Sequence, residues 1–531
     1  MLASYLVLVP LIVLLWSAIQ IILLRIWRPR LSYYWLTATF FALVSWSAIL
    51  LVKPYLPVNL TLSNWQPVEI FPLSLILSID PFSWLFALGA ITILLAVNLT
   101  GIADADRETD NAPDWMSFAG SAGITGLSLF VMFASNILTV LLAWMLLDLI
   151  EFIIYLSLAK DRRESEKVVI KFSTRVSGVL IGIYAGMSAY AQNLPLSLNE
   201  LSSVTSGLLI LAVCVRIGLI PNTPILPFRL PPQTGYGALL RLVTTAANFP
   251  LLVKAAQSGG EPQLQNFLWI WTGLTALLSA FSWFSSTDVR SGRHYWIIAL
   301  SCLVIASAIN AQSLAVMAWG WVLMLPGGLI LISHDRNRWL RGLFILGVLA
   351  IFGLPYSPSW FGWLLFSGNF HIGWLMLLVA QSLVIAGYFL HAFKKSDPTI
   401  TTEGWTRWIF AWGLFLIILT TYLLSYWSLE GSLGIAEQNP PLLSSWPVLV
   451  ILVLLLLIWL GGRRIPSRVK NSFSGISAKL SFGKILRPLW SFFFLIRRGL
   501  LFVSKTLESQ SGILWALLIL LLLISLFSQV I

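Results

Sequence analysis

Charged residues are scarce in this chain. They make up 10% of its 531 positions, whereas 58% of the positions are hydrophobic. Soluble globular domains carry about 25% charged residues and fewer apolar ones, so the composition excludes a set of water-soluble domains. A membrane-spanning helix needs roughly 20 apolar residues, and the chain has room for many of them. The composition predicts an all-α polytopic membrane protein.

Cysteine and histidine are also scarce. Both cysteines, Cys214 and Cys302, lie inside apolar stretches, which excludes a disulfide scaffold and a cysteine-based metal cluster. The four histidines lie far apart, so neither a histidine-rich metal site nor paired haem ligands are expected. No glycine-rich phosphate loop is visible either. We therefore expect no metal and no bound cofactor in this chain.

Acidic residues are scarcer than basic ones. The chain has 21 Asp and Glu and 33 Lys and Arg. Ten of the bases fall between Arg463 and Lys505, where there is no acid. Apolar residues recur at helical spacing between these bases, which favours an amphipathic segment over 463–511 that lies along the cytoplasmic interface and binds anionic lipid. A plain basic linker is the alternative. The excess positive charge does not indicate a nucleic-acid partner.

About sixteen apolar windows of spanning length follow one another along the chain. They lie near 4–24, 33–52, 82–103, 115–134, 136–158, 169–191, 203–220, 235–257, 265–286, 294–310, 312–333, 339–356, 371–392, 406–427, 443–461 and 512–530. Lys and Arg collect in alternate loops, which the positive-inside rule places in the cytoplasm, so both termini are expected to face outward. The acidic loop 104–114 departs from this pattern, but acids weigh little in the rule.

Two acidic side chains lie at membrane depth. Asp148 and Glu151 are three residues apart in the window 136–158, with no base in the same window. Charge inside hydrocarbon is costly and usually faces the bundle interior or a water path. One hypothesis places both residues on an ion pathway, and the other makes them a static buried pair with a base from another helix, such as Arg175.

Proline interrupts two windows. Arg216 ends one apolar stretch and is followed by Pro221, Pro224 and Pro227. Proline cannot continue a regular helix, and broken helices at membrane depth mark binding or conduction sites in transporters. The alternative is a cytoplasmic loop with Arg216 reaching to the interface. The next window carries Arg241 and Lys254.

A second interruption contains Pro355 and Pro358 and lies five windows after the first. This separation predicts two inverted five-helix repeats. We divide the chain accordingly into N-terminal transmembrane helices, a first repeat, a second repeat, additional helices, and a basic interfacial helix with the last span. The five parts cover residues 1–114, 115–260, 261–395, 396–462 and 463–531.

Motifs spread over most of the chain carry a resemblance to a known family. They include LSIDPFSWLF, NILTVLLAWMLLDLI, STRVSG, VRIGLIPNTPILPFRLPPQTGYGALLR, TDVRSGRHYWI and GLPYSPSWFG. In these motifs the chain resembles the antiporter-like proton-channel subunits of complex I and of Mrp-type sodium/proton antiporters, above all their largest, subunit-5-like member. The resemblance implies inverted repeats around a hydrated polar axis, partner membrane subunits, and a prokaryotic-type energy-conserving membrane, plasma or thylakoid.

The chain departs from the family pattern at the positions that titrate. The resemblance implies a glutamate at Met145, lysines at Arg216 and Trp363, and a histidine at Thr223. Arginine keeps its charge at any relevant pH, so Arg216 can hold a carboxylate but cannot relay a proton. Asp148 follows Met145 by three residues, on about the same helix face, and we expect it to pair with Arg216.

Three functions remain open. The first is a proton- or cation-translocating membrane subunit of an NADH/quinone-oxidoreductase-like or Mrp-antiporter-like complex. Its expected ion-pathway residues are Asp148, Glu151, Arg175, Arg216, Arg241 and Lys254. The second is a non-conducting scaffold or assembly subunit with the same fold. The third is an enzyme of lipid or carbohydrate chemistry, for which the acidic loop lacks a nucleophile. No catalytic centre is expected in this chain.

Overall fold

The computed structural model describes most of the first 462 residues. The described ranges are 5–27, 31–63, 74–105, 115–159, 161–220, 234–260, 262–333, 340–354, 356–367, 372–394, 404–429 and 446–462. The basic segment 463–511, the last apolar window and Pro221, Pro224, Pro227 and Pro355 lie outside them. The predictions made for those residues therefore stay predictions.

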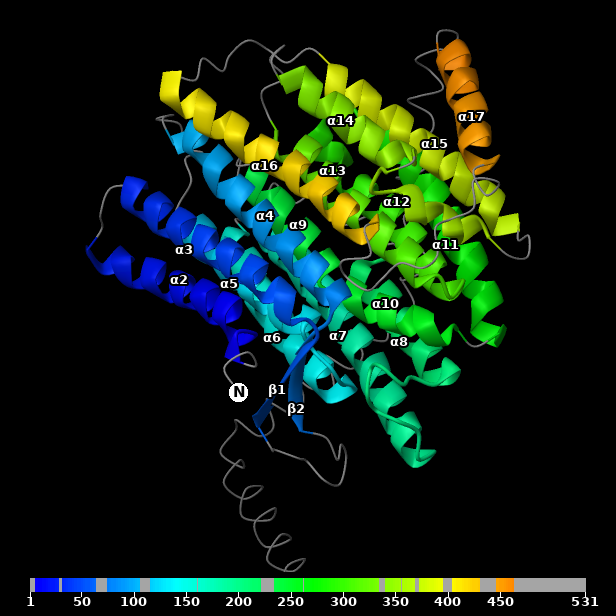
Figure 1. Ribbon diagram of the computed structural model, residues 1–531, viewed down its shortest axis with the longest axis horizontal. Coiled ribbons are helices and arrows are strands. Elements are labelled where there is room, and N and C mark those ends of the chain that lie inside the picture. Colours follow the sequence, from blue (N-terminus) through cyan, green and yellow to red (C-terminus); the bar gives the residue numbers. More distant parts are fainter. Residues whose placement is uncertain are drawn as a thin grey trace, which may run out of the picture. The chain divides into compact units, whose positions relative to one another are not determined.

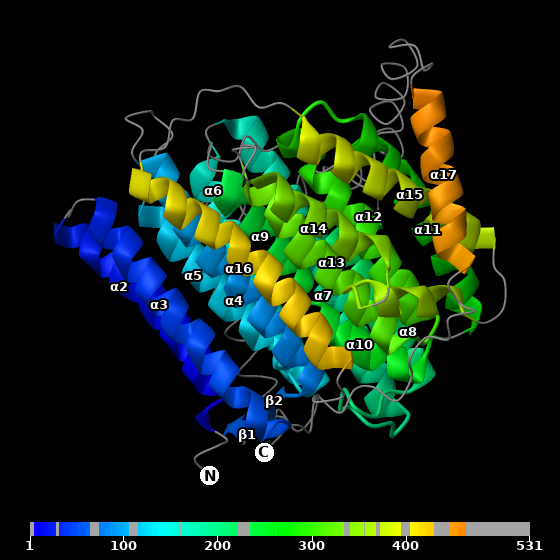
Figure 2. The same ribbon diagram turned by 45° about the horizontal axis from the view of Figure 1, so that its top comes forward.

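The described part is a bundle of apolar helices with one small β-hairpin (Figures 1 and 2). The helices are α2 (Leu8–Trp27), α3 (Leu31–Val52), α4 (Pro81–Ala105), α5 (Trp115–Met132), α6 (Ile137–Leu158), α7 (Arg162–Ala191), α8 (Ser203–Ile217), α9 (Thr234–Ala246), α10 (Phe249–Ser258), α11 (Pro262–Ser285), α12 (Val289–Ile309), α13 (Ser313–Ile332), α14 (Arg341–Phe352), α15 (Ile372–Phe393), α16 (Gly404–Leu429) and α17 (Trp446–Gly462), with short 3₁₀ turns η1 (Lys53–Tyr55) and η3 (Trp360–Phe366). Within the described ranges, twelve spans are long and apolar enough to cross a membrane, and three further apolar helices are shorter. All of them coincide with predicted windows, so the prediction of an all-α integral multi-pass membrane protein is confirmed.

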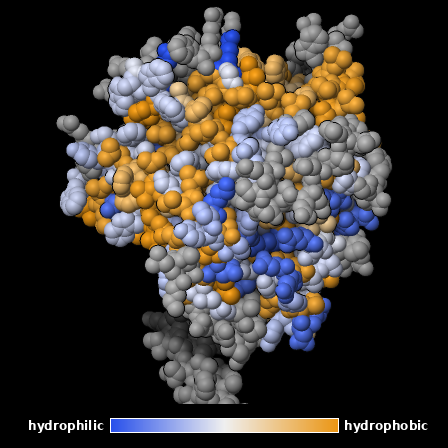
Figure 3. Space-filling view, in the orientation of Figure 1, coloured by the Kyte–Doolittle hydropathy of each residue, from blue (hydrophilic) through white to orange (hydrophobic). Residues whose placement is uncertain are grey.

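The helices differ in how deeply they lie in the bundle. The α13 span is completely buried within the chain and packs against α4, α9, α10, α12 and α16. The α2 and α3 spans, in contrast, are 33% and 28% buried. Hydrophobic side chains cover much of the coloured surface in Figure 3, which is the expected outer face of a protein solvated by lipid chains.

Both predicted interruptions are present where the structure describes them. Helix α8 has 15 residues and ends at Gly218, and α14 has 12 residues and ends at Gly353. Both glycines have positive φ, 89° and 77°, a backbone conformation that glycine adopts without the steric cost of a Cβ. Neither helix reaches the roughly 20 residues that a span needs. Pro358 is buried in the turn that follows α14.

One further interruption was not predicted. The window 235–257 is two helices, α9 and α10, separated at Ala247 and Asn248. Pro250 stands in the first turn of α10 and has no N–H to donate, while the Asn248 amide donates to the Thr244 and Thr245 carbonyls at 3.1 Å each. A proline and a side-chain amide therefore replace the regular helical hydrogen bonds at this point.

The β-hairpin was also not predicted. Strands β1 (Val58–Ser63) and β2 (Leu75–Ile79) pair antiparallel. Backbone hydrogen bonds join the hairpin to the connection between α5 and α6, with Ser78 N donating to Phe133 O at 2.7 Å. Asn136 caps α6 by accepting from Thr139 N and donates from Nδ2 to Ser74 O at 2.7 Å. The hairpin thus fixes the start of α6, the helix that carries Asp148 and Glu151.

Candidate functional site

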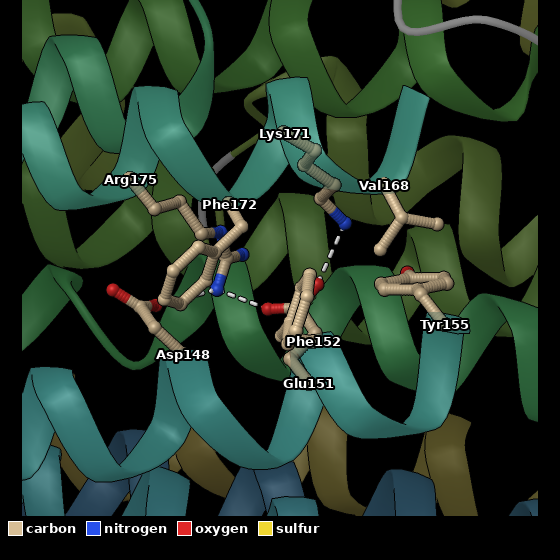
Figure 4. Close-up of a pocket in the computed structure, with 8 residues that line it drawn as sticks. All are labelled: Asp148, Glu151, Phe152, Tyr155, Val168, Lys171, Phe172 and Arg175. Atoms are coloured by element: carbon tan, nitrogen blue, oxygen red, sulfur yellow. Dashed lines mark hydrogen bonds and ion pairs between the residues drawn. The ribbon is translucent and has the colours of Figure 1, made fainter. Parts of the chain in front are cut away.

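Five charged side chains from α6, α7 and α8 meet inside the bundle. They are Asp148, Glu151, Lys171, Arg175 and Arg216, and we call them the ion-pair cluster (Figure 4 shows all but Arg216). Asp148 and Glu151 lie near the middle of α6 and are each 2% exposed. A cluster at this depth is shielded from water, which strengthens its internal electrostatic interactions and makes an unpaired charge costly.

Asp148 is held by two guanidinium groups. Arg216 Nη1 lies 2.6 Å from Asp148 Oδ2, and Arg216 Nη2 donates to Oδ1 at 2.8 Å. Arg175 Nη1 donates to the same Oδ1 at 3.0 Å. The Arg216 contact is therefore bidentate, the geometry in which arginine binds a carboxylate most strongly. The expected pairing of Asp148 with Arg216 is present, and the alternative partner Arg175 is present as well.

Glu151, the second carboxylate of the cluster, contacts Lys171 and Arg175. Lys171 Nζ donates to Glu151 Oε1 at 2.6 Å, and Arg175 forms an ion pair with Glu151 Oε2. Lys171 also lies over the Tyr155 ring, 4.0 Å from its centroid. All four carboxylate oxygens thus contact a cationic group, and two carboxylates stand against three bases, a formal charge of +1.

Small and aromatic residues make room for Arg216. Its guanidinium lies over the Trp144 ring, 4.3 Å from the centroid. On α7, a Cβ added to Gly178 would lie 2.3 Å from Arg216 Cγ and 2.9 Å from Ala212 O. The close approach of α7 and α8 therefore requires glycine at position 178, and it brings Arg216 onto Asp148.

Further polar groups lie beyond the cluster, on α9, on α10 and before the start of α4. Arg175 Nη2 donates to Thr244 Oγ1 at 3.3 Å, and Asn248 lies one turn farther along. In the middle of α10, Lys254 is 4% exposed, and its Nζ lies 3.1 Å from Oδ2 of Asp80, which directly precedes α4. These groups and the cluster together form what we call the polar line.

Comparisons with known proteins show which solved structures share this fold. The sequence matches no family model and no curated protein. Solved structures do match: a chain of the Mrp complex from Dietzia sp. DQ12-45-1b aligns with all of this chain, with a TM-score of 0.71 and 16% identity. This chain spans 63% of the length of that Mrp chain.

Two respiratory complexes give similar matches. A chain of the membrane-bound sulfane sulfur reductase, an archaeal respiratory membrane complex, has a TM-score of 0.63 and 14% identity over 98% of this chain and 99% of its own. A chain of respiratory complex I from Thermus thermophilus has a TM-score of 0.62 and 15% identity over 85% and 99%. This chain has the antiporter-like fold of Mrp and complex I membrane subunits.

Aromatic side chains surround the second interruption of this chain. Trp363, at a position where the resemblance implies lysine, donates from Nε1 to Gly353 O at 2.7 Å. Its ring packs with Phe366 and edge-on to Trp319, and all three side chains are buried. An indole N–H thus satisfies a carbonyl that the broken helix leaves free, in surroundings that are aromatic.

One expectation about α6 was wrong. Met145 and Asp148 were placed on about the same helix face, but Met145 is 55% exposed and Asp148 is 2% exposed. Positions three apart on an α-helix differ by about 60° around its axis, and the boundary between the buried and outer faces of α6 falls between them. Asp148 therefore contacts Arg216 from the buried face of α6, whereas Met145 belongs to the outer face.

The structure brings some of the predicted site residues together and leaves one aside. Asp148, Glu151, Arg175 and Arg216 meet in the cluster, and Lys254 lies on the polar line. Arg241 on α9 is half-buried and is not one of the five side chains of the cluster. Sequence reasoning missed Lys171 and Asp80, although Lys171 stands four residues before Arg175 and hence on the same helix face.

Proposed function

We propose that this chain is a proton- or cation-translocating membrane subunit of a multi-subunit complex of the NADH/quinone-oxidoreductase-like or Mrp-antiporter-like kind. The observation that carries the proposal is the polar line, in which charged groups lie buried within a bundle of apolar helices. Charge at such depth is costly and usually marks an ion or proton path. The antiporter-like fold and the multi-subunit nature of the structures that share it support the same function.

Each part of the polar line has a role in this proposal. The ion-pair cluster is the central relay, Thr244 and Asn248 continue the path, and the Lys254–Asp80 pair lies at its other end. Buried lysines change their protonation state readily, whereas arginines do not. Arg175 and Arg216 therefore position Asp148 and Glu151, and the lysines exchange protons.

The proposal also includes the chain's surroundings. Other membrane subunits are the proposed partners, in a prokaryotic-type energy-conserving membrane, plasma or thylakoid. Anionic lipid at 463–511 and the five-part division of the chain remain predictions from the sequence.

A non-conducting scaffold or assembly subunit is the second candidate. It is favoured by the arginine at position 216 and by Trp363 at the second interruption, since neither side chain releases a proton at relevant pH. A chain with this role would keep the fold and its outer helix surfaces without needing a polar line.

Ion flux separates the two functions. The complex would be purified through a tag on this chain and reconstituted into vesicles, and flux would be normalised to the amount of this chain. We expect Asp148→Asn to abolish flux, because it removes the carboxylate that both arginines bind. Asp161→Asn, at the exposed start of α7, is the matched control and should retain it. Flux in Asp148→Asn equal to that of the unmodified chain would contradict conduction through this site.

A further inference from the structure

We propose that a small opening between α6 and α7 binds the phosphate of an anionic phospholipid, with Lys167 and Lys171 as the contacting bases. The acyl chains of this lipid lie along the outer faces of the two helices. The proposal concerns residues other than the basic segment 463–511, and it does not depend on ion translocation.

The opening leads from the surface of the described bundle to the edge of the ion-pair cluster (Figure 4). Glu151, Tyr155, Lys171 and Arg175 are among the residues that line it. The side chain of Lys171 is 18% exposed, compared with 9% for Arg175 and 2% for Arg216. Lys171 is therefore the base of the cluster that a molecule outside the bundle contacts first.

The length of α7 places Lys171 near the level of the lipid headgroups. Helix α7 has 30 residues, more than the roughly 20 that cross the hydrocarbon core. Residues 176–191 carry no charge, and about 20 residues counted back from the end of α7 reach Phe172. Lys171 thus lies at the boundary of the hydrocarbon, and Lys167 lies one turn outside it. The positive-inside rule expects this end of α7 at the cytoplasmic face.

The charges beside the opening do not balance. The cluster has two carboxylates and three bases. Lys167 stands four residues before Lys171, on the same face of α7, and it forms no ion pair with any residue that the structure describes. Glu166, next to Lys167 in the chain, pairs with Arg162 instead. The opening therefore has an excess of positive charge, which favours a negatively charged ligand.

Hydrogen-bond donors beside the opening also lack acceptors. A lysine ammonium has three N–H donors, and one of those on Lys171 binds Glu151 at 2.6 Å. Arg175 is 8% exposed, and its Nε has no hydrogen-bond partner among the described residues. A phosphodiester supplies one negative charge and several oxygen acceptors, and its hydrogen bonds to cationic donors are strong. It matches both the charge and the free donors.

The surface next to the opening suits acyl chains better than water. Leu149 and Ile153 on α6 and Val169 and Leu180 on α7 are exposed hydrophobic side chains. Basic pockets between membrane helices at the cytoplasmic side are typical binding sites for anionic lipid headgroups. A soluble anion gains nothing from the adjoining apolar surface, so we assign the phosphate to a lipid.

Photolabelling of the intact complex tests this site. The complex is purified through a tag on this chain and reconstituted with a photoreactive phosphatidylglycerol or a photoreactive phosphatidylcholine. Mass spectrometry then maps the labelled peptides. We expect peptides of α6 and α7 to be labelled more by phosphatidylglycerol, because the zwitterionic lipid brings no net negative charge.

Variants of the two lysines assign the labelling to the proposed contacts. Lys167→Gln and Lys171→Gln should each lower it on the order of fivefold, the effect of one base near an anionic lipid surface. Lys171→Arg should retain it, because arginine also binds phosphate. Lys394→Gln, which removes an exposed base at the end of α15, is the matched control and should leave it unchanged. Lys167→Gln breaks no ion pair of the described residues, so it keeps the test valid if Lys171→Gln fails to fold.

Three results would overturn the proposal. The first is equal labelling of α6 and α7 by the two lipids. The second is unchanged labelling in Lys167→Gln. The third is competition by inorganic phosphate beyond that of sodium chloride at equal ionic strength, which would identify a site for a soluble anion. No readout here uses ion flux, so failure of this proposal and failure of the proposed function are distinguishable.

Discussion

At the scale of single residues, the site depends on an arginine where related chains are expected to carry lysine. Arg216 gains a bidentate contact with Asp148 that lysine cannot make, because its guanidinium presents paired donors in a fixed plane. Arg175 adds a second guanidinium to the same carboxylate. The consequence is an Asp148 carboxylate that is held on both oxygens by guanidinium groups.

The pairing of Asp148 and Arg216 can be tested by measuring stability. Breaking a buried ion pair by removing one partner costs about 3–5 kcal/mol, because the other charge is left uncompensated. We expect Asp148→Asn and Arg216→Gln each to lower the thermal midpoint and the abundance of the protein. The double variant removes one charge of each sign and should recover much of the loss. Losses that simply add in the double variant would show that the two side chains are not coupled.

The sequence identified most members of the cluster because charge is conspicuous in an apolar window. Asp148, Glu151, Arg175 and Arg216 could all be found in this way. Lys171 was missed because it lies close to the polar start of α7, where a base is expected to face the interface. The contact between Asp80 and Lys254 joins elements more than 170 positions apart in the sequence, and no local pattern predicts such a pair.

At the scale of helices, the two interruptions are built differently. Helix α8 ends one residue after Arg216 of the ion-pair cluster, whereas after α14 an indole closes the break. Trp363 donates to the Gly353 carbonyl and packs against that glycine. The second interruption is therefore sealed by aromatic packing.

Glycine at position 353 is essential to this arrangement. Its φ is 77°, and an added Cβ would lie 2.2 Å from a ring carbon of Trp363. The left-handed conformation alone costs a residue with a Cβ about 1–2 kcal/mol, and overpacking a core typically costs about 1–3 kcal/mol more. We expect Gly353→Ala to lower the thermal midpoint of the purified protein by several degrees, measured through its tryptophan fluorescence.

Gly342→Ala is the control on the same helix. A Cβ there meets nothing within 4 Å, so this variant should match or slightly exceed the unmodified protein in stability. Equal effects of the two substitutions would contradict the packing of Trp363 against Gly353.

Element positions followed well from hydrophobic windows, since a membrane requires long apolar helices. The third interruption did not, because a single Pro250 inside an apolar window is weak evidence for a break. The β-hairpin was missed for a related reason. Its strands are short, they lie outside the hydrocarbon windows, and their pairing depends on the connection between α5 and α6.

At the scale of the whole molecule, the antiporter-like fold places a buried polar line inside an apolar bundle. Among the residues that the structure describes, the buried ion pairs are concentrated in the first half, around α6, α7 and α8, and the second interruption is aromatic. This asymmetry supports a path through the first half and a mainly structural role for the second.

The central claim is that this chain works within a larger ion-translocating membrane complex. The most direct test is mass spectrometry of the proteins that co-purify with the tagged full-length chain from gently solubilised membranes. The account predicts quinone-oxidoreductase-type or Mrp-type membrane subunits in fixed proportion to this chain. Recovery of the chain alone, or with an unrelated soluble protein, would contradict it.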